Sequence, residues 1–241
     1  MKSTSRAFLS LYSRLLDAYG PQGWWPLPSM AGARGFDSGG YHRGSYRWPR
    51  SPEGRFEIIL GAILTQNTAW TNVEKALERL RRAGLYLPDQ FLQVPVGSVA
   101  RFIRSSGYFN QKAKKLKVAA RVFSQPGFLE PRSAPSREEL LSLWGVGRET
   151  ADSILLYAFG RPVFVVDAYT RRIFGRLGVF DGTESYDQVQ QKFHDLVPAH
   201  PRTYNEMHAL IVEHAKQHCR ARPVCGGCPI SSSCRYFRAS S

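Results

Sequence analysis

Apolar residues recur along much of this chain at spacings of three and four, which is the pattern of helices with one buried face. The first such run covers residues 6–19, and the pattern returns at Phe56 and continues, with loops between, to about residue 218. Between these runs, residues 20–54 are dominated by glycine, proline, tryptophan, arginine and serine, which predicts a long irregular segment. The sequence therefore predicts an all-α fold with one irregular segment near its start.

The corner within Leu140–Asp152 is the strongest local signal. Ser136 and Glu139 form a capping box, so a helix can begin at Arg137, and it must end at Gly145, where unusual backbone angles cost little. The apolar residues of a second helix follow with helical spacing at Ala151, Ile154, Leu155 and Ala158. The Gly-Val-Gly turn leaves N–H groups uncovered at a helix N-terminus, where a phosphate is stabilised. On the turn alone, an ordinary corner between two helices is the commoner meaning.

Two further features follow along the chain. Asp167 comes directly after the apolar run Val163–Val166 and precedes a helical pattern, so it is a predicted N-cap. A carboxylate at a helix start is held rigidly and stays ionised, which suits catalysis as well as capping. All four cysteines then lie in one short segment, at Cys219, Cys225, Cys228 and Cys234.

Charge and composition narrow the range of partners. The 241-residue chain carries 33 Lys and Arg against 19 Asp and Glu, and this net charge of +14 indicates a polyanion such as nucleic acid. No apolar run approaches the ~20 residues of a membrane-spanning helix, so we expect no membrane partner. The N-terminus lacks the pattern of a secretion signal, so we expect a cytoplasmic protein whose clustered cysteines hold metal rather than disulfides.

The cysteine spacing is compatible with two kinds of metal site. Four cysteines in this arrangement can hold tetrahedral zinc or a [4Fe–4S] cluster, and spacing alone leaves the two about even. Zinc ribbons usually show two Cys-x2-Cys pairs, whereas this segment has one pair flanked by single cysteines, which favours the cluster. His214 and His218 lie nearby, but four thiolates already complete a site, so we expect these histidines to pack or to face solvent.

In this order, the turn, the aspartate and the cysteine loop resemble the helix-hairpin-helix DNA glycosylases of the endonuclease III family, over Phe56–Cys234. The resemblance implies the two-lobed HhH-GPD fold. A six-helix barrel ending in the hairpin would cover residues 51–161, and an iron–sulfur lobe would combine residues 1–50 and 162–241, with 20–54 as an irregular linker. It further implies a monomer, associated with the nucleoid, that binds double-stranded DNA containing a damaged base in a cleft between the lobes.

The resemblance also supports a [4Fe–4S] cluster over zinc and assigns roles to single residues. Asp167, in the segment Val166-Asp-Ala-Tyr-Thr-Arg171, matches the family's catalytic aspartate. Gln66, at a polar break between helices, matches a glutamine that enters the duplex where the base leaves. The expected contacts to DNA phosphates are Gly145, Val146, Gly147, Arg148, Thr150, Lys112, Arg220 and Arg222. The lysines of the segment after Gly107 predict a basic helix face: Lys112, Lys114, Lys115 and Lys117.

Two departures from the family pattern bear on chemistry and on the loop. Bifunctional members carry a lysine after Gly-Val-Gly-Arg, whose amine attacks the sugar, whereas this chain carries Glu149, which we place with Asp167 in the catalytic site. Water is then the expected nucleophile, so we expect a monofunctional glycosylase. The first cysteine gap is five residues instead of the family's usual six, which affects the loop's shape and not the number of ligands.

The substrate is the least constrained expectation. The segment around Glu149 resembles the branch that removes 3-methyladenine and related alkylated bases. The aromatic residues that could stack on such a cationic base are Trp70, Trp144 and Tyr169. Alternatives stay open: a bifunctional glycosylase and lyase for oxidised pyrimidines, a glycosylase for mismatched thymine, a lesion-binding protein without chemistry, and an iron–sulfur redox protein.

Overall fold

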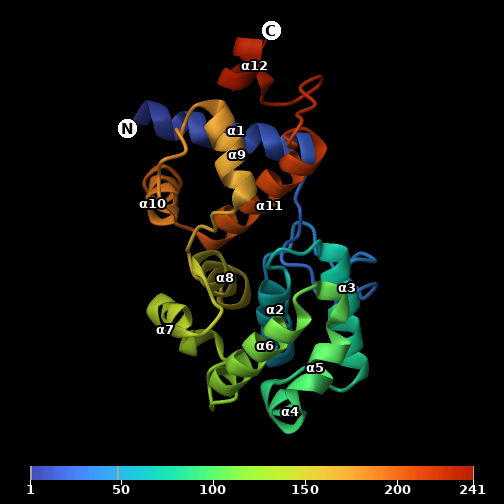
Figure 1. Cartoon of the computed structure of the whole chain (residues 1–241). Helices are drawn as coiled ribbons and strands as arrows, with labels where there is room; N and C mark the ends of the chain where they lie inside the picture. Colours follow the sequence, from blue (N-terminus) through green and yellow to red (C-terminus); the bar gives the residue numbers. More distant parts are fainter. Residues whose placement is uncertain (1, 48, 241) are drawn as a thin grey trace. The chain divides into compact units, whose positions relative to one another are not determined.

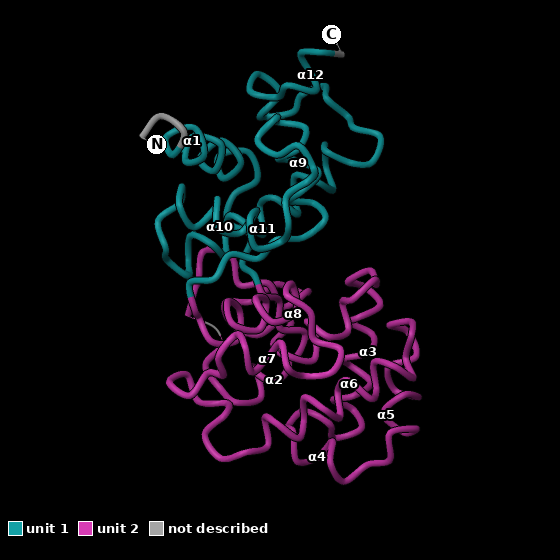
Figure 2. Tube along the Cα trace, turned by 60° about the vertical axis from the view of Figure 1, so that its left-hand side comes forward, with its two compact units in different colours: residues 1–24, 162–241 teal, residues 25–161 magenta. Residues whose placement is uncertain are grey.

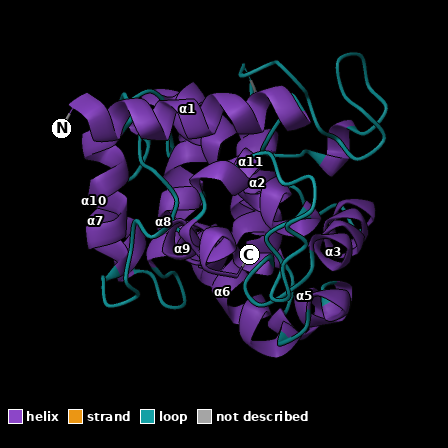
Figure 3. Ribbon diagram, turned by 90° about the horizontal axis from the view of Figure 1, so that it is seen from above, coloured by secondary structure: helices purple, strands orange, loops and turns teal. Residues whose placement is uncertain are grey.

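The computed structural model describes residues 2–47 and 49–240, and over these residues it contains helices and loops but no strand, which confirms the all-α prediction (Figure 1, Figure 3). The α-helices are α1 (Lys2–Tyr19), α2 (Pro52–Leu64), α3 (Trp70–Arg82), α4 (Pro88–Gln93), α5 (Val96–Phe102), α6 (Phe109–Phe123), α7 (Arg137–Ser142), α8 (Arg148–Ser153), α9 (Ala168–Leu177), α10 (Tyr186–Leu196), α11 (Pro201–Gln217) and α12 (Arg235–Ser240). Shorter helical turns are η1 (Pro28–Met30), η2 (Arg104–Ser106), η3 (Pro131–Ser133), η4 (Ile154–Ala158) and η5 (Ser231–Ser233). None of the described helices combines the length and the apolar character that crossing a membrane requires.

The chain divides into two compact units, which Figure 2 colours separately. Unit 1 combines Met1–Trp24 with Pro162–Ser241, and unit 2 is the continuous stretch Trp25–Arg161. Unit 1 therefore contains α1 and α9 to α12, and unit 2 contains α2 to α8.

Unit 2 is built around α2, which is apolar on all sides. Every residue from Ile58 to Leu64 is buried, as expected for a helix in the middle of a core. Helices α3, α6, α8 and the π-helical turn η4 all pack against α2, and α4 and α5 pack on α6. Helix α8 runs directly into η4, whose five residues are all buried, so the predicted apolar face at Ala151–Ala158 is completely covered.

Residues 25–50, which we expected in the iron–sulfur lobe, belong to unit 2 instead. The reason lies in backbone groups of this segment that bind α2 and α3. The Ser29 amide donates to Glu57 Oε1 at 2.9 Å, and Arg81 Nη1 donates to the Ser29 carbonyl at 2.7 Å. These contacts join residues far apart in the sequence, so a periodicity analysis gives no sign of them.

Unit 1 is held together by an aromatic core that joins both ends of the sequence. Helix α1 packs against α10 and α11, and α9 packs against α11 and α12 (Figure 1). The rings of Phe164 and Phe193 stack with centroids 3.9 Å apart, and Phe174 meets Phe193 edge-on at 4.8 Å. Phe8 of α1 contacts Phe174 at 5.2 Å. This core fixes the start of α9, where Asp167 lies.

Candidate functional site

The predicted hairpin forms within unit 2, with the capping box in place. The Ser136 hydroxyl accepts from the Glu139 amide at 3.1 Å, and Glu139 Oε2 accepts from the Ser136 amide at 2.6 Å. Gly145 has φ +85°, in the left-handed region that glycine favours. The Lys115 stem covers it closely, because a Cβ built on Gly145 would lie 2.5 Å from Lys115 Cγ. Gly147, the N-cap of α8, has an ordinary φ of −94° and open space around it.

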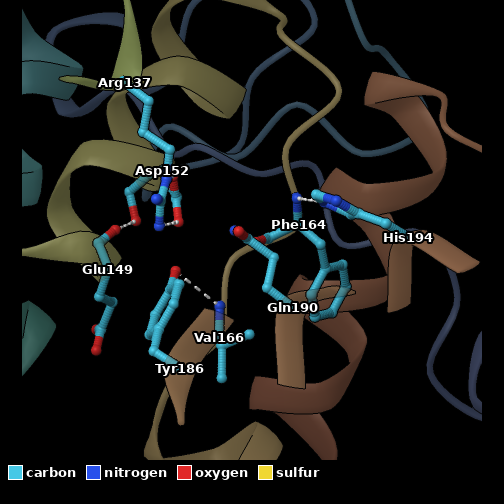
Figure 4. A network of polar contacts seen from close by, with 9 residues as sticks. Arg137, Glu149, Asp152, Phe164, Val166, Tyr186, Gln190 and His194 are labelled. Atoms are coloured by element: carbon cyan, nitrogen blue, oxygen red, sulfur yellow. Dashed lines mark hydrogen bonds and ion pairs between the residues drawn. The ribbon is translucent and has the colours of Figure 1, made fainter. Parts of the chain in front are cut away.

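An ion pair joins the two helices of the hairpin (Figure 4). Arg137 Nε donates to Asp152 Oδ1 at 2.7 Å, and Arg137 Nη2 donates to Asp152 Oδ2 at 3.1 Å. The Asp152 side chain is completely buried, while a quarter of the Arg137 side chain is exposed. Because two parallel hydrogen bonds fix both position and angle, this pair sets how α7 and α8 meet.

Gln66 lies at the corner between α2 and α3 and is bonded to the hairpin turn. Its Nε2 donates to the Gly145 carbonyl and to Thr150 Oγ1, both at 3.0 Å. Its Oε1 accepts from Lys115 Nζ at 2.6 Å. Three predicted site residues, Gln66, Gly145 and Thr150, therefore meet at the hairpin turn.

The basic face predicted on α6 is only partly present, and Lys112 is the main difference. Lys112 is 2% exposed, and its Nζ donates to the carbonyls of Leu64 and Ser106 and to Thr68 Oγ1 at 2.7–2.8 Å. Burial, with a smaller effect of Lys115, lowers the pKa of Lys112 to about 8. Lys112 thus joins three acceptors inside unit 2, so the predicted contact with a DNA phosphate would require its ammonium group to leave these partners.

A second lysine of the predicted face also binds inside unit 2. Lys117 Nζ donates to the carbonyl of Phe91, in the last turn of α4, at 2.6 Å and to that of Val94, just after the helix, at 2.8 Å. These carbonyls have no partner within their own short helix, so the lysine satisfies them. Lys114, in contrast, is exposed.

Exposed aromatic residues flank this region, and one of them escaped the sequence analysis. Tyr108 is 73% exposed and has φ +45°, although it is not glycine. Such backbone strain in a non-glycine residue is common at functional sites. Trp144, in the hairpin turn, is 53% exposed. Trp70 differs from both, because its ring packs edge-on against Trp25 within unit 2 at 5.5 Å.

The other predicted hairpin residues divide into exposed and internal ones. Arg148 and Glu149 are exposed in the first turn of α8, where negative charge is favoured by the helix dipole. Val146 and Thr150 are buried, and Thr150 serves as a partner of Gln66. These two residues therefore shape the turn from within, whereas the exposed pair can meet a ligand.

Asp167 is the N-cap of α9 in unit 1, as predicted. Its Oδ1 accepts from the Thr170 amide at 2.6 Å and from Thr170 Oγ1 at 2.8 Å. His208 Nε2 on α11 lies 3.6 Å from Asp167 Oδ2. Burial raises the pKa of Asp167, but the interactions with His208 and Thr170 outweigh this, so the pKa lies below its usual value. The carboxylate is therefore ionised, although its side chain is only 11% exposed.

The extended segment before Asp167 is held by one face of α10 (Figure 4). Tyr186, Gln190 and His194 are four residues apart, so they share a helix face. The Phe164 amide donates to His194 Nε2 at 3.0 Å, the Phe164 carbonyl accepts from Gln190 Nε2 at 2.6 Å, and the Val166 amide donates to the Tyr186 hydroxyl at 3.2 Å. The backbone groups of Phe164 and Val166 thus bind side chains of α10 instead of a neighbouring strand. These hydrogen bonds fix the position of the segment that leads into α9.

The four cysteines line one cavity in unit 1. Each is a free thiol of intermediate exposure, and Arg176 Nη1 donates to Cys219 Sγ at 3.2 Å. Within the described part of the chain, no group of three or more His, Cys, Asp and Glu side chains is arranged to hold a single metal ion. The donor set still fits a sulfur-liganded group, because four thiols face a common space and hydrogen-bond donors reach them.

Helix α9 joins the cysteine loop to the aspartate. Asp167 caps its first turn, while Arg176 in its last turn donates to the carbonyls of Arg220 and Ala221 at 2.6 and 2.8 Å. Arg172 Nε, between them, donates to the Cys219 carbonyl at 2.8 Å. Arg220 itself is exposed on the loop.

The remaining predicted residues are Arg222 and Tyr169. Arg222 is exposed on the cysteine loop, where it is accessible to a ligand. Tyr169 is half-buried in the first turn of α9, and the Arg172 guanidinium lies over its ring at 5.0 Å. Sequence reasoning missed His208, although its position three and four residues before the buried Ile211 and Val212 is a helical signal that it faces inward.

Comparisons with known proteins agree with this arrangement. The model of the HhH-GPD superfamily of base excision DNA repair proteins matches residues 60–199. A protein of Methanocaldococcus jannaschii, named as a candidate DNA repair glycosylase, is 41% identical over 231 residues, which are 93% of this chain and 94% of that protein. Endonuclease III of Bacillus subtilis is 30% identical over 182 residues, 75% of this chain and 80% of the enzyme. The structure of the H. pylori 3-methyladenine DNA glycosylase bound to 1,N6-ethenoadenine has a TM-score of 0.67 and 29% identity, covering 89% of this chain and 97% of that one.

Proposed function

Because this chain belongs to the HhH-GPD superfamily of base excision DNA repair proteins, we propose that it is a monofunctional DNA glycosylase for alkylated purines such as 3-methyladenine. In this proposal it binds double-stranded DNA, flips the damaged base out of the stack and hydrolyses the bond between base and sugar. The observation that carries the proposal is Asp167, a nearly dry carboxylate that Thr170 orients and that stays ionised.

The chemistry assigned to Asp167 follows from how its two oxygens are used. When the base departs with the bonding electrons, positive charge develops on the sugar. Oδ1 already accepts two hydrogen bonds from Thr170, so Oδ2 is the oxygen available to stabilise that charge. A fixed carboxylate in a site of low dielectric does this more strongly than one in water. Water then adds to the sugar carbon, and the carboxylate accepts the proton that the water loses.

Glu149 supports hydrolysis over lyase chemistry. It is exposed in the first turn of α8, at the position where bifunctional relatives would need an amine. A carboxylate cannot form a Schiff base with the sugar. Two lysines of α6 are engaged elsewhere, because Lys112 binds three acceptors inside unit 2 and Lys115 donates to Gln66. Water is therefore the nucleophile in this proposal, and the product is an intact abasic site.

DNA binding is assigned to the exposed parts of unit 2 and of the cysteine loop. Arg148 beside the hairpin turn, and Arg220 and Arg222 on the loop, are exposed cations that suit phosphates. Tyr108 is exposed and held at an unusual backbone angle, which suits an aromatic that stacks on a base in the gap left by flipping. Gln66 fits the same gap once its bonds to the turn open.

Two arguments favour an alkylated purine. The H. pylori glycosylase that shares this fold at 29% identity acts, by its name, on 3-methyladenine. A purine alkylated on a ring nitrogen is also cationic, so it departs as a neutral molecule and needs no acid to protonate it. Such a departure suits the proposed site, because its catalytic group, Asp167, is an ionised carboxylate and not an acid. Trp144 and Tyr169 are accessible enough to stack on such a cation, whereas Trp70 is largely occupied by Trp25.

We assign a [4Fe–4S] cluster to the cysteine loop, held by Cys219, Cys225, Cys228 and Cys234. Support comes from the four thiols, which line one cavity in unit 1. The hydrogen bond from Arg176 to Cys219 Sγ is of the kind that tunes cluster sulfurs. When bound, the cluster would supply a rigid anchor for the loop, and thereby for Arg220 and Arg222.

A panel of duplexes tests the proposal. Each would carry 3-methyladenine, 1,N6-ethenoadenine, an oxidised pyrimidine or a G·T mismatch, and strand breaks would be scored with and without alkali. We expect release of 3-methyladenine, whose alkylated form in DNA is cationic, and strand breaks only after alkali. Asp167→Asn should lower turnover by roughly 10²–10⁴-fold while DNA binding persists. Breaks without alkali, together with a covalent adduct after borohydride reduction, would support a bifunctional enzyme, and turnover unaffected by Asp167→Asn would refute the mechanism.

A further inference from the structure

The unexpected neighbour of the catalytic aspartate is a histidine from the middle of α11. His208 Nε2 lies 3.6 Å from Asp167 Oδ2, and both side chains are nearly dry, with 6% and 11% exposed. The distance is too long for a good hydrogen bond but well within the range of an electrostatic contact. Because Oδ1 is already occupied by Thr170, His208 faces the oxygen that the mechanism uses.

The ring of His208 is held in place by apolar surfaces. Trp24 meets it edge-on with centroids 5.6 Å apart and an angle of 85°, and Phe164 meets it at 6.4 Å and 87°. These rings exclude water from the pair, so the interaction between His208 and Asp167 is stronger than it would be at the surface. The imidazole can therefore turn little, and its Nε2 stays directed at the carboxylate.

Neighbouring residues of α11 fix the segment that carries Trp24. Asn205 Nδ2 donates to the Trp24 carbonyl at 2.8 Å, and the Gln22 amide donates to Glu206 Oε1 at 2.6 Å. Helix α11 thus contacts two segments at once: Asn205 and Glu206 bind the backbone of residues 22–24, and His208 lies against Asp167 at the start of α9. His208 belongs to this arrangement and is not a solitary core histidine.

We propose that His208 is a positioning residue for Asp167: with a proton on Nε2, it holds Oδ2 in the orientation that faces the sugar cation and keeps that oxygen negatively charged. Thr170 fixes one oxygen of the carboxylate and His208 fixes the other. This inference rests on the proposed glycosylase function and adds a second residue to the same site.

Kinetics on the 3-methyladenine duplex provide the first test. His208→Phe keeps a ring of similar shape but removes the N–H, so we expect kcat to fall by roughly 10- to 100-fold with KM within about twofold. His208→Gln restores a donor and should recover part of the lost kcat. His200→Asn, at the N-cap of the same helix, is the matched control and should behave as wild type. A kcat for His208→Phe equal to wild type, or an equal loss in Phe and Gln variants, would overturn the proposal.

A spectroscopic test does not depend on activity. Side-chain nitrogen resonances of the histidines would be compared between wild type and Asp167→Asn at one pH. We expect the His208 resonances to shift, while those of His42, which is bonded to Ser45 and Trp25 in unit 2, stay unchanged. Unchanged His208 resonances would refute the pairing. If His208 responds but wild type releases no base from any duplex, the pairing stands and the proposed function fails.

Discussion

Replacing Gly145 by alanine adds one methyl group to the hairpin turn at a place with two obstacles. The first is the backbone, because Gly145 has φ +85° and alanine avoids that region. The second is Lys115, since a Cβ at residue 145 would lie 2.5–2.6 Å from three carbons of the lysine stem. Gly147, two residues later, has an ordinary φ of −94° and no atom within 4 Å of such a Cβ. The two glycines therefore form a matched pair.

The cost at Gly145 can be estimated from these contacts. Holding alanine in the left-handed region costs roughly 1–2 kcal/mol. The Lys115 stem is flexible and can move, but moving it breaks the 2.6 Å bond from Nζ to Gln66 Oε1. A charge-assisted bond that is partly exposed contributes about 1 kcal/mol, so the free energy of unfolding should fall by about 2–3 kcal/mol in total. Gly147→Ala should change it by less than about 0.5 kcal/mol, because a stiffer unfolded chain offsets the poorer N-cap.

Urea denaturation of Gly145→Ala and Gly147→Ala, each alone and combined with Lys115→Ala, measures these changes in the free energy of unfolding. In the Lys115→Ala background, Gly145→Ala should cost only the backbone term, so the two substitutions should be coupled by about 1 kcal/mol. Fluorescence anisotropy with an abasic-site duplex gives a second readout. There, Gly147→Ala should weaken binding although stability is unchanged, because its Cβ would approach the DNA phosphate that the proposed function places at the turn.

Two results would refute this reasoning. One is equal destabilisation by alanine at the two glycines, since only Gly145 has the unusual angle and the close neighbour. The other is a Gly145→Ala cost that Lys115→Ala does not reduce, which would mean that the lysine stem does not cover the turn.

Three further predictions follow from contacts described above. Arg137→Met removes the cation of the ion pair with the buried Asp152 carboxylate, so the free energy of unfolding should fall by about 3 kcal/mol in urea denaturation. A loss below about 1 kcal/mol would contradict a stabilising role of this ion pair. Burial lowers the pKa of Lys112 from 10.5 to about 8. Between about pH 8 and pH 10.5 the unfolded chain therefore binds more protons than the folded chain, so the free energy of unfolding should rise with pH in this window. The rise should be present in wild type and absent from Lys112→Met. Exposed Lys114→Met should leave that slope unchanged. Cys225→Ala should abolish iron binding and the accompanying visible absorbance, and zinc in metal analysis of wild type would contradict the cluster.

Local rules of helix termini account for what the sequence predicted correctly. The capping box of Ser136 and Glu139, the left-handed glycine at 145 and the N-cap at Asp167 each depend on a few adjacent residues. Such signals can be read from the sequence because they depend on neighbouring residues and not on the rest of the fold. They were enough to place the hairpin and the start of α9 along the chain.

The errors concern residues whose environment is set by distant segments. Lys112 was assigned to a basic face, yet it lies on the same side of α6 as buried Leu116 and Ala119, four and seven positions later. That spacing was visible, but a lysine on an apolar face finds its acceptors only through tertiary contacts, here with Leu64 and Thr68. His208 was missed for the same reason.

The geometry of α9 has a mechanical consequence. A ten-residue helix is about 15 Å long and moves as a stiff rod. The Asp167 carboxylate is at one end, and Arg176 ties the other end to backbone carbonyls of the cysteine loop. If the contacts between Arg176 and the cysteine loop loosened, the other end of α9 could shift and carry the Asp167 carboxylate with it. Displacement of a catalytic group by about 1 Å can slow a reaction about 10²-fold. If Asp167 acts as proposed, damage to the cysteine loop should therefore slow base excision although Asp167 itself is unchanged.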